Sequence, residues 1–220
     1  MDSKYEKVNK KWDEIFSRQI PKIPESPLTG NKTFDSAIKW ACNGAERIVD
    51  FGCGNGTVLF LCALNGSKFH IGIDLSEKGI EVAKKRSYDM AVGEYKFIQG
   101  GIEELKNIES SCIDSVVLSN IIDNLYPEDS ELLIKEVKRI LKVNGKVLVK
   151  LNPYITEDKI KEFNIEVVKD SLLDDGLLLL NRSTEEWYEF FNNEFTIKEF
   201  KEIYYKEHDQ YNRLFYLKKE

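Results

Sequence analysis

Three glycines at alternate positions, preceded by an aspartate, form the segment of this chain that is best suited to bind a ligand. The segment reads Asp50, Phe51, Gly52, Cys53, Gly54, Asn55, Gly56 and Thr57. Glycines allow the backbone to turn tightly and let a ligand approach without a side chain in the way. A helix that begins at Thr57 would add unpaired N–H groups and a partial positive charge. We therefore predict that residues 50–57 hold a ligand with an anionic group.

A second aspartate, Asp74, lies 18 residues after Gly56, at the end of the next predicted strand. In nucleotide-binding sheets an acidic residue near this place accepts hydrogen bonds from ribose hydroxyls. The structural alternative is that Asp74 only helps Ser76 to start the following helix. We favour the ribose contact.

The elements that must position these residues alternate between strand and helix. The predicted strands are Arg47–Phe51, Lys68–Ile73, Tyr95–Gln99, Ile113–Ser119 and Lys146–Leu151. The predicted helices between them begin at Thr57, Glu77 and Pro127, and the last of them stops at Asn144 and Gly145. Such alternation implies right-handed crossovers and a parallel sheet.

The segments on either side of this core follow other patterns. Helical spacing of Tyr5, Trp12 and Phe16 predicts a helix that ends before Pro21, and a shorter helix is expected from Thr33 to Asn43. The later part is predicted to contain a helix from Thr156, a hairpin turning at Asp174 to Gly176, a helix capped by Ser183 and Glu186, and two antiparallel strands, Phe195–Tyr205 and Tyr211–Leu217. We expect one domain over residues 1–220, comprising an N-terminal helical cap (1–45), a ligand-binding core (46–151), an insertion that covers the substrate (152–194) and a C-terminal strand pair (195–220).

The charge and the apolar runs exclude some classes of partner. With 38 acidic and 32 basic residues the net charge is -6, so no global positive field attracts DNA. The longest apolar run, Val58 to Leu64, is too short to cross a membrane. Four cysteines without CxxC spacing suggest reduced thiols rather than a metal site. We expect a cytoplasmic protein with no membrane partner.

The spacing of Gly52, Gly54 and Gly56 after Asp50 resembles class I S-adenosylmethionine-dependent methyltransferases, and the resemblance runs from Arg47 to Leu151. The dinucleotide fingerprint of NAD-dependent reductases instead requires a small residue three positions after its second glycine, where this chain has Thr57. The resemblance implies an α/β, three-layer Rossmann-like fold with a mostly parallel seven-stranded sheet whose last strand is antiparallel. It implies S-adenosylmethionine as cofactor and S-adenosylhomocysteine as product. The carboxylate of that cofactor suits a helix N-terminus, and its ammonium and sulfonium suit a carboxylate such as Asp50.

Further cofactor residues follow from the resemblance alone. Besides Asp50, Gly52, Cys53, Gly54 and Gly56, they are Asp74, Leu75, Gly101, Ile102, Glu103, Ser119 and Asn120. The family places an acidic residue near the adenine amino group, and this chain has Gly101 at that place. A backbone carbonyl, Glu103 or water is left to take its role.

Methyl transfer from a sulfonium is an in-line displacement, so the main task of the enzyme is to hold the nucleophile about 3 Å from the methyl carbon. No metal is required, and a base is needed only for an acceptor that arrives protonated. His208, between the last two strands, is the first candidate base, and Asp123 and Tyr126 are the second. The predicted substrate contacts are Trp12, Tyr154, Tyr211 and Arg213, the last as a clamp for an anionic group.

We predict methyl transfer to a small molecule by a monomer or homodimer. Three alternatives stay open: a module that binds the cofactor without catalysis, an NAD-dependent reductase, and a methyltransferase acting on RNA or protein.

Overall fold

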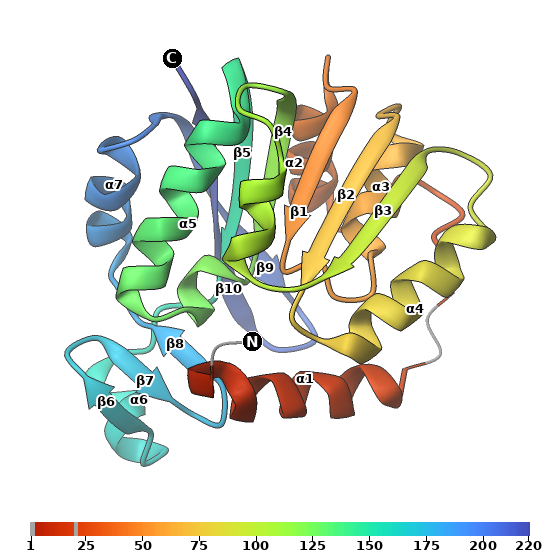
Figure 1. Ribbon diagram of the computed structural model, residues 1–220. Coiled ribbons are helices and arrows are strands. Elements are labelled where there is room, and N and C mark those ends of the chain that lie inside the picture. Colours follow the sequence, from red (N-terminus) through yellow and green to blue (C-terminus); the bar gives the residue numbers. More distant parts are fainter. Residues whose placement is uncertain (1–2, 20–21) are drawn as a thin grey trace.

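A seven-stranded sheet forms the centre of the protein in the computed structural model, which describes residues 3–19 and 22–220 (Figure 1). The strand order is β3-β2-β1-β4-β5-β10-β9. Strands β1 to β5 run parallel, and β10 lies antiparallel to both β5 and β9. The strands are β1 (Arg47–Phe51), β2 (Phe69–Asp74), β3 (Glu94–Gln99), β4 (Ile113–Ser119), β5 (Leu141–Leu151), β9 (Thr196–Tyr205) and β10 (Gln210–Lys218). The predicted sheet is confirmed.

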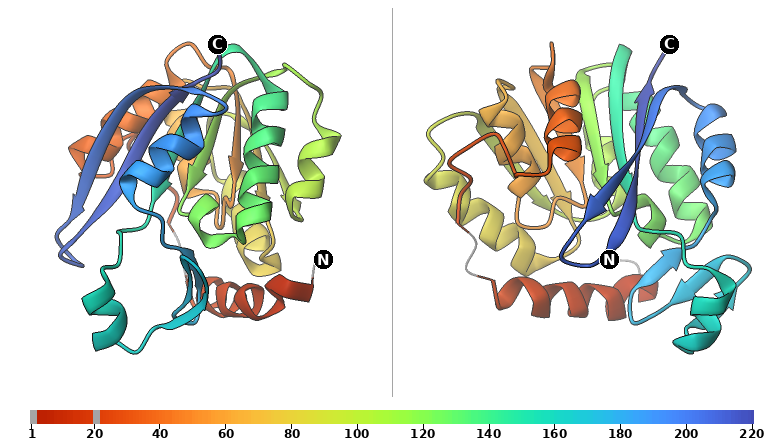
Figure 2. Two further views of the ribbon diagram at one scale, coloured as in Figure 1. Left: turned by 90° about the vertical axis from the view of Figure 1, so that its left-hand side faces the viewer. Right: turned by 180° about the vertical axis from the view of Figure 1, so that it is seen from behind.

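Helices cover both faces of this sheet, so the central strands consist mainly of buried residues (Figure 2). On one face lie α2 (Lys32–Cys42), α3 (Thr57–Leu64) and α4 (Glu77–Tyr88). On the other lie α5 (Pro127–Ile140), α7 (Thr184–Asn192) and the 3-10 turn η2 (Ile102–Asn107). The three-layer architecture is thereby confirmed. In the described part of the chain, no helix is long and apolar enough to cross a membrane.

The two N-terminal helices do not form one cap. Helix α2 buries Phe34, Ala37, Ile38, Ala41 and Cys42 in the core beside the sheet. Helix α1 (Glu6–Ser17) has no fully buried residue and crosses the edge where the parallel strands end (Figure 1). Its end precedes Pro21, which lies outside the described residues. Only α1 is therefore placed to cover a ligand.

The boundary between α5 and β5 differs from the prediction. The helix ends at Ile140 rather than at Asn144, and β5 begins at Leu141, because Leu141 pairs with Ile113 of the neighbouring strand. Asn144 has a positive φ of 64°, and its N–H donates to the carbonyl of Lys219. The asparagine and glycine thus mark an irregular part of the strand instead of the end of a helix.

The insertion after β5 contains α6 (Glu157–Glu162) and a separate antiparallel sheet. Strands β7 (Leu172–Asp174) and β8 (Leu178–Leu180) form the predicted hairpin, and β6 (Glu166–Lys169), which was not predicted, adds a third strand. All four residues of β6 are exposed, so the sequence shows no alternation of apolar and polar residues that would predict this strand.

Candidate functional site

The glycine segment leaves β1 as a tight loop that is tied to the end of β2. Gly52, Gly54 and Gly56 have φ values of 78°, 50° and 79°, which lie in a region that residues other than glycine rarely adopt. The N–H groups of Gly52 and Cys53 donate to the carbonyl of Ile73 at 2.8 and 3.1 Å. A Cβ at Gly52 would lie 2.7 Å from the Ile121 side chain, so this glycine also makes room for the loop that follows β4.

Asp74 connects the glycine loop to the start of α4. One carboxylate oxygen accepts a hydrogen bond from the N–H of Gly54 at 2.7 Å, and the other accepts one from the N–H of Ser76 at 2.8 Å. Burial raises the pKa of Asp74, and the two backbone hydrogen bonds oppose that shift. Each oxygen keeps a second lone pair, and the side chain lies in the wall of a cavity. Both roles considered for Asp74 are therefore compatible with its position.

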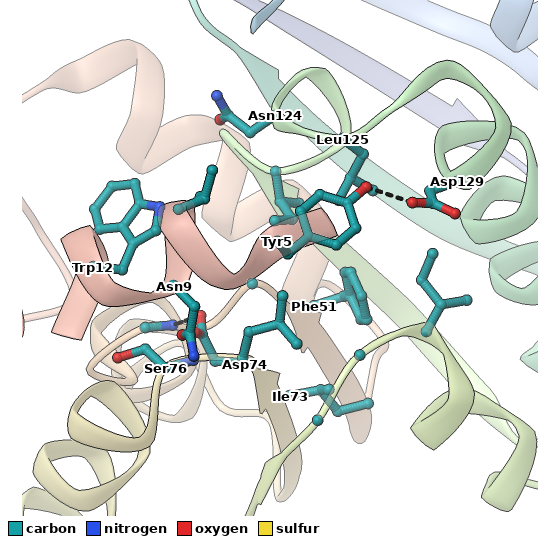
Figure 3. Close-up of a pocket in the computed structure, with 18 of the residues that line it drawn as sticks. Tyr5, Asn9, Trp12, Phe51, Ile73, Asp74, Ser76, Asn124, Leu125 and Asp129 are labelled. Atoms are coloured by element: carbon teal, nitrogen blue, oxygen red, sulfur yellow. Dashed lines mark hydrogen bonds between the residues drawn. The ribbon is translucent and has the colours of Figure 1, made fainter. Parts of the chain in front are cut away.

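A cavity of about 320 Å³ lies at the carboxyl ends of β1, β2, β3 and β4, beneath α1 (Figure 3). Ten of the predicted site residues lie in its wall: Trp12, Gly52, Gly54, Asp74, Leu75, Gly101, Ile102, Glu103, Ser119 and Asn120. The parallel order of the strands explains this, because their carboxyl ends meet at one edge of the sheet.

Helix α1 forms the roof of this cavity through Val8, Asn9, Trp12 and Phe16, and Tyr5 extends the roof just before the helix. The Trp12 and Phe16 rings stack with centroids 5.7 Å apart, and Phe16 packs against Gly54, where a Cβ would lie 2.7 Å from the ring. The helical spacing of these residues predicted an apolar stripe, which packing against a core would also explain. The structure instead turns the stripe towards a cavity.

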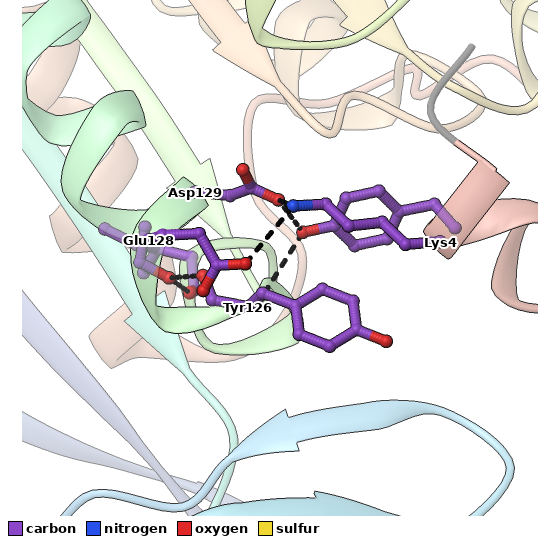
Figure 4. Close-up of polar contacts among 7 residues, drawn as sticks. Lys4, Tyr126, Glu128 and Asp129 are labelled. Carbon is purple, nitrogen blue, oxygen red and sulfur yellow. Dashed lines mark hydrogen bonds and ion pairs between the residues drawn. The ribbon is translucent and has the colours of Figure 1, made fainter.

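Polar contacts hold the roof at both ends. The Tyr5 hydroxyl donates to Asp129 at 2.5 Å and accepts from the N–H of Tyr126 at 3.1 Å, and the Lys4 ammonium lies 2.7 Å from the same Asp129 oxygen (Figure 4). At the other end, Asp13 accepts from the Ser76 hydroxyl at 2.6 Å. Polar contacts at both ends therefore tie α1 over the cavity as its cover.

Replacing Tyr5 by phenylalanine should loosen this cover. The variant loses two hydrogen bonds worth ~1 kcal/mol each, so we expect amide hydrogens of α1 to exchange about 30-fold faster while those of the sheet are unchanged. Hydrogen exchange followed by mass spectrometry measures both. Tyr204→Phe is the matched control, because Tyr204 donates to Asp209 at 2.9 Å on the exposed β9–β10 turn. Equal exchange rates of α1 in the two variants would contradict the prediction.

Glu103 lies where the acidic residue missing at position 101 would be. A Cβ at Gly101 would lie 2.7 Å from Oε2 of Glu103, and the N–H of Gly101 donates to Oε1 at 3.1 Å. The carboxylate thus folds back over Gly101 in the cavity wall. Of the three substitutes left open by the sequence, this geometry favours Glu103.

Asp50, Cys53 and Gly56 lie behind the cavity wall rather than in it. Asp50 is 1% exposed, and burial together with the charge of Asp74 raises its pKa to about 8. Cys53 packs its sulfur against β2, where a Cβ at Gly72 would lie 2.7 Å away. The prediction that the Asp50 carboxylate contacts a bound cation is not supported by this arrangement, because the side chain is buried and does not line the cavity.

The three predicted bases do not reach the cavity. Asp123 is fully buried and accepts hydrogen bonds from the backbone N–H and the amide of Asn152 at 2.6 and 3.1 Å. Tyr126 precedes α5 and packs its ring edge-on against Tyr5. His208 is exposed on the β9–β10 turn, two strands beyond β5 in the sheet. None of the three lies in the cavity wall.

Of the four predicted substrate contacts, only Trp12 lines the cavity. Arg213 is 3% exposed, and its guanidinium donates to the carbonyls of Asn152 and Arg182 at 3.1 and 2.9 Å, so it binds loops together instead of a substrate. Tyr154 and Tyr211 are exposed, and Tyr211 packs against Tyr204. Contrary to the prediction, these three residues therefore do not line the cavity.

Sequence reasoning missed several residues of the wall. Tyr5, Asn9, Asn124 and Asp129 face the cavity together in Figure 3. For Tyr5 and Asn9 a signal existed, because they share the helical stripe with Trp12 and Phe16. For Asn124 and Asp129 nothing in the local sequence separates them from solvent-exposed polar residues.

Comparison with known proteins agrees with this geometry. A family model described as a methyltransferase domain matches residues 43–205. The ribosomal protein L11 methyltransferase of Dictyoglomus turgidum is 28% identical over 64% of this chain, and the ubiquinone biosynthesis O-methyltransferase of Acinetobacter baylyi is 26% identical over 66%. These alignments cover 42% and 58% of the two relatives, so the chain spans about half of their length.

Solved structures show the same fold. The N-methyltransferase NodS from Bradyrhizobium japonicum, solved with S-adenosylhomocysteine, superposes with a TM-score of 0.70. The match covers 97% of this chain and 99% of that one at 12% sequence identity.

Proposed function

Because this chain belongs to the methyltransferase domain family, we propose that it transfers a methyl group from S-adenosylmethionine to a small-molecule acceptor. The observation that carries the proposal is the cavity itself, in which the glycine loop, Asp74 and Glu103 line one wall beneath α1. Bound there, the cofactor would supply an electrophilic methyl group on a sulfonium. The roof that helix α1 forms over the cavity supports a small acceptor over RNA or protein.

The residues of the wall fit the parts of this cofactor. Asp74 keeps lone pairs for ribose hydroxyls, and the Glu103 carboxylate can accept from the adenine amino group. Leu75 and Ile102 offer apolar contacts to the adenine ring. Ser119 and Asn120, at the end of β4, are left for the amino-acid end of the ligand, next to the glycine loop.

Glu103→Gln should lower the affinity for S-adenosylhomocysteine about 10-fold, because an ionised acceptor forms a stronger hydrogen bond than a neutral one. Titration calorimetry measures this. S-inosylhomocysteine, which carries a carbonyl oxygen in place of the adenine amino group, should bind the glutamine variant no more weakly than the unchanged protein, because the amide can donate to that oxygen. Glu104→Gln is the control, since Glu104 lies outside the wall and accepts from Asn107 at 3.1 Å. A loss of the same size with both ligands would exclude the proposed contact.

For methyl transfer, the residues of this chain must position the acceptor and exclude water. Helix α1 covers the cavity with aromatic rings, which keeps water from the reacting atoms. The titratable side chains of the wall are Tyr5, Asp74, Glu103, Lys106 and Asp129. Asp129 already accepts from Tyr5 and pairs with Lys4, so the arrangement favours an acceptor whose nucleophile arrives with a free lone pair.

His208→Ala should leave methyl transfer within 2-fold of the unchanged protein, because the imidazole is exposed outside the cavity. Transfer of a radioactive methyl group from labelled S-adenosylmethionine to fractionated metabolite pools measures this and identifies the acceptor. A fall of 10-fold or more would restore His208 as a base. Failure of the protein to bind S-adenosylmethionine by calorimetry would remove the proposed function altogether.

The relatives differ in what their names say they act on. One is named for ribosomal protein L11 and another for ubiquinone biosynthesis, and the structural neighbour is an N-methyltransferase. The names of the relatives therefore do not identify the acceptor of this chain.

A further inference from the structure

We propose that the side-chain oxygen of Asn120 is a hydrogen-bond acceptor reserved for an N–H group of the bound ligand, and that Asp123 and Asn152 hold it in that orientation. This inference rests on the proposed function and deepens it. Two ligand groups have the required chemistry: the ammonium of the cofactor and an amine nitrogen of the methyl acceptor.

The orientation of Asn120 follows from a chain of hydrogen bonds that begins at a carboxylate. An ionised carboxylate can only accept, so the amide NH₂ of Asn152 must be the group that lies 3.1 Å from Asp123. The backbone N–H of Asn152 donates to the same oxygen at 2.6 Å. Burial raises the pKa of Asp123 to about 6, so the carboxylate is ionised at pH 8.

The next bond of the chain transmits this polarity to Asn120. With its NH₂ turned to Asp123, Asn152 offers its carbonyl oxygen to Asn120, whose NH₂ lies 3.1 Å from it. The oxygen of Asn124, 3.2 Å from the NH₂ of Asn152, keeps Asn152 from flipping. Asn120 must therefore turn its oxygen away from Asn152. Asn120 is part of the cavity wall and Asn152 is not.

The oxygen of Asn120 is left without a partner. Among the described residues it accepts no hydrogen bond, and it is screened from solvent. An unpaired buried acceptor is costly, and native proteins rarely keep one without a reason. Asn120 lies in the cavity wall directly after β4, beside the glycine loop, where the proposed function places the amino-acid end of the cofactor, so this acceptor faces the part of the site in which a ligand N–H is expected.

The backbone of Asn120 allows a clean test. Its φ of 54° is in the left-handed region, where glycine is favourable, so Asn120→Gly removes the amide without adding strain. Asn144→Gly is the matched control, because Asn144 has a φ of 64° and is exposed at a distance from the cavity. Both variants are compared with the unchanged protein at pH 8.

Three ligands separate the two sources of the N–H group. They are S-adenosylhomocysteine, its analogue without the α-amino group, and sinefungin, which carries an amino group in place of the transferred methyl group. We expect Asn120→Gly to weaken one amine-bearing ligand about 10- to 100-fold relative to its partner without that amine. A selective loss of S-adenosylhomocysteine over the deaminated analogue assigns the oxygen to the cofactor, and a selective loss of sinefungin over S-adenosylhomocysteine assigns it to the acceptor amine.

Asn152→Ala tests the positioning role. It should reduce the preference for the amine-bearing ligand over its partner without that amine, as Asn120→Gly does. A merely structural effect would lower the melting temperature and weaken the binding of all three ligands alike. Equal changes for all ligands in Asn120→Gly would overturn the inference while leaving the proposed function intact. If the unchanged protein bound none of the three ligands, the proposed function itself would fail.

Discussion

Asp74→Asn should raise the dissociation constant for S-adenosylhomocysteine about 100-fold or more. The substitution keeps the shape of the side chain but replaces a charged acceptor that serves Gly54, Ser76 and, in our proposal, the ribose hydroxyls. Hydrogen bonds to a charged group are worth ~1.5–3 kcal/mol each, so weakening two of them accounts for the expected loss. Titration calorimetry at pH 7.5 measures the constant.

Asp114→Asn provides the matched control for this experiment. Asp114 also accepts from two backbone N–H groups, those of Glu46 and Arg47 at 3.1 and 2.8 Å, but at the opposite end of β1. Both variants should lose stability, and only Asp74→Asn should lose affinity. Equal affinities in the two variants would show that Asp74 has no part in the ligand site.

Asp50→Asn should make the protein more stable at alkaline pH. Burial, with the charge of Asp74, raises the pKa of Asp50 to about 8, so the native state binds this proton more tightly than the unfolded chain. The stabilisation is complete below the unfolded pKa near 4 and is lost as the pH rises to about 8. At about 1.4 kcal/mol per pKa unit, the ionised side chain costs on the order of 5 kcal/mol above pH 8.

The asparagine variant cannot ionise, so its advantage should grow from pH 5 to pH 9. Urea unfolding at pH 5, 7 and 9 measures the difference, with the exposed Asp170→Asn as control. Parallel pH profiles for the variant and the unchanged protein would contradict the prediction. In calorimetry, a larger loss of affinity for cationic S-adenosylmethionine than for neutral S-adenosylhomocysteine would show that the Asp50 charge acts on the ligand through the loop.

Much of the fold was determined by local patterns. The alternation of apolar runs and helices predicted every strand of the main sheet, because buried parallel strands and amphipathic helices have different periods. The main boundary error has a local cause. A glycine after an asparagine ends many helices, but here Leu141 already pairs with Ile113 in the sheet, so α5 ends at Ile140. Strand β6 was missed since its residues are exposed and carry no burial pattern.

The cofactor part of the site was predictable for a related reason. The glycine loop and Asp74 depend on backbone geometry at the ends of two neighbouring strands, which sequence order already specifies. Only the tertiary structure decided the rest. Helical spacing showed that Trp12 belongs to an apolar stripe, but the same stripe suits a core or a cavity, and its neighbours decide which.

Polar residues depend even more on distant partners. Arg213, Asp123 and His208 had suitable chemistry for catalysis or binding, yet two of them are consumed by hydrogen bonds to loops far away in the sequence, and the third lies in solvent. Conversely, the oxygen of Asn120 is available to a ligand only because Asp123 and Asn152 orient the amide. A sequence states which groups can donate or accept, and only the folded chain decides which of them are left for a ligand.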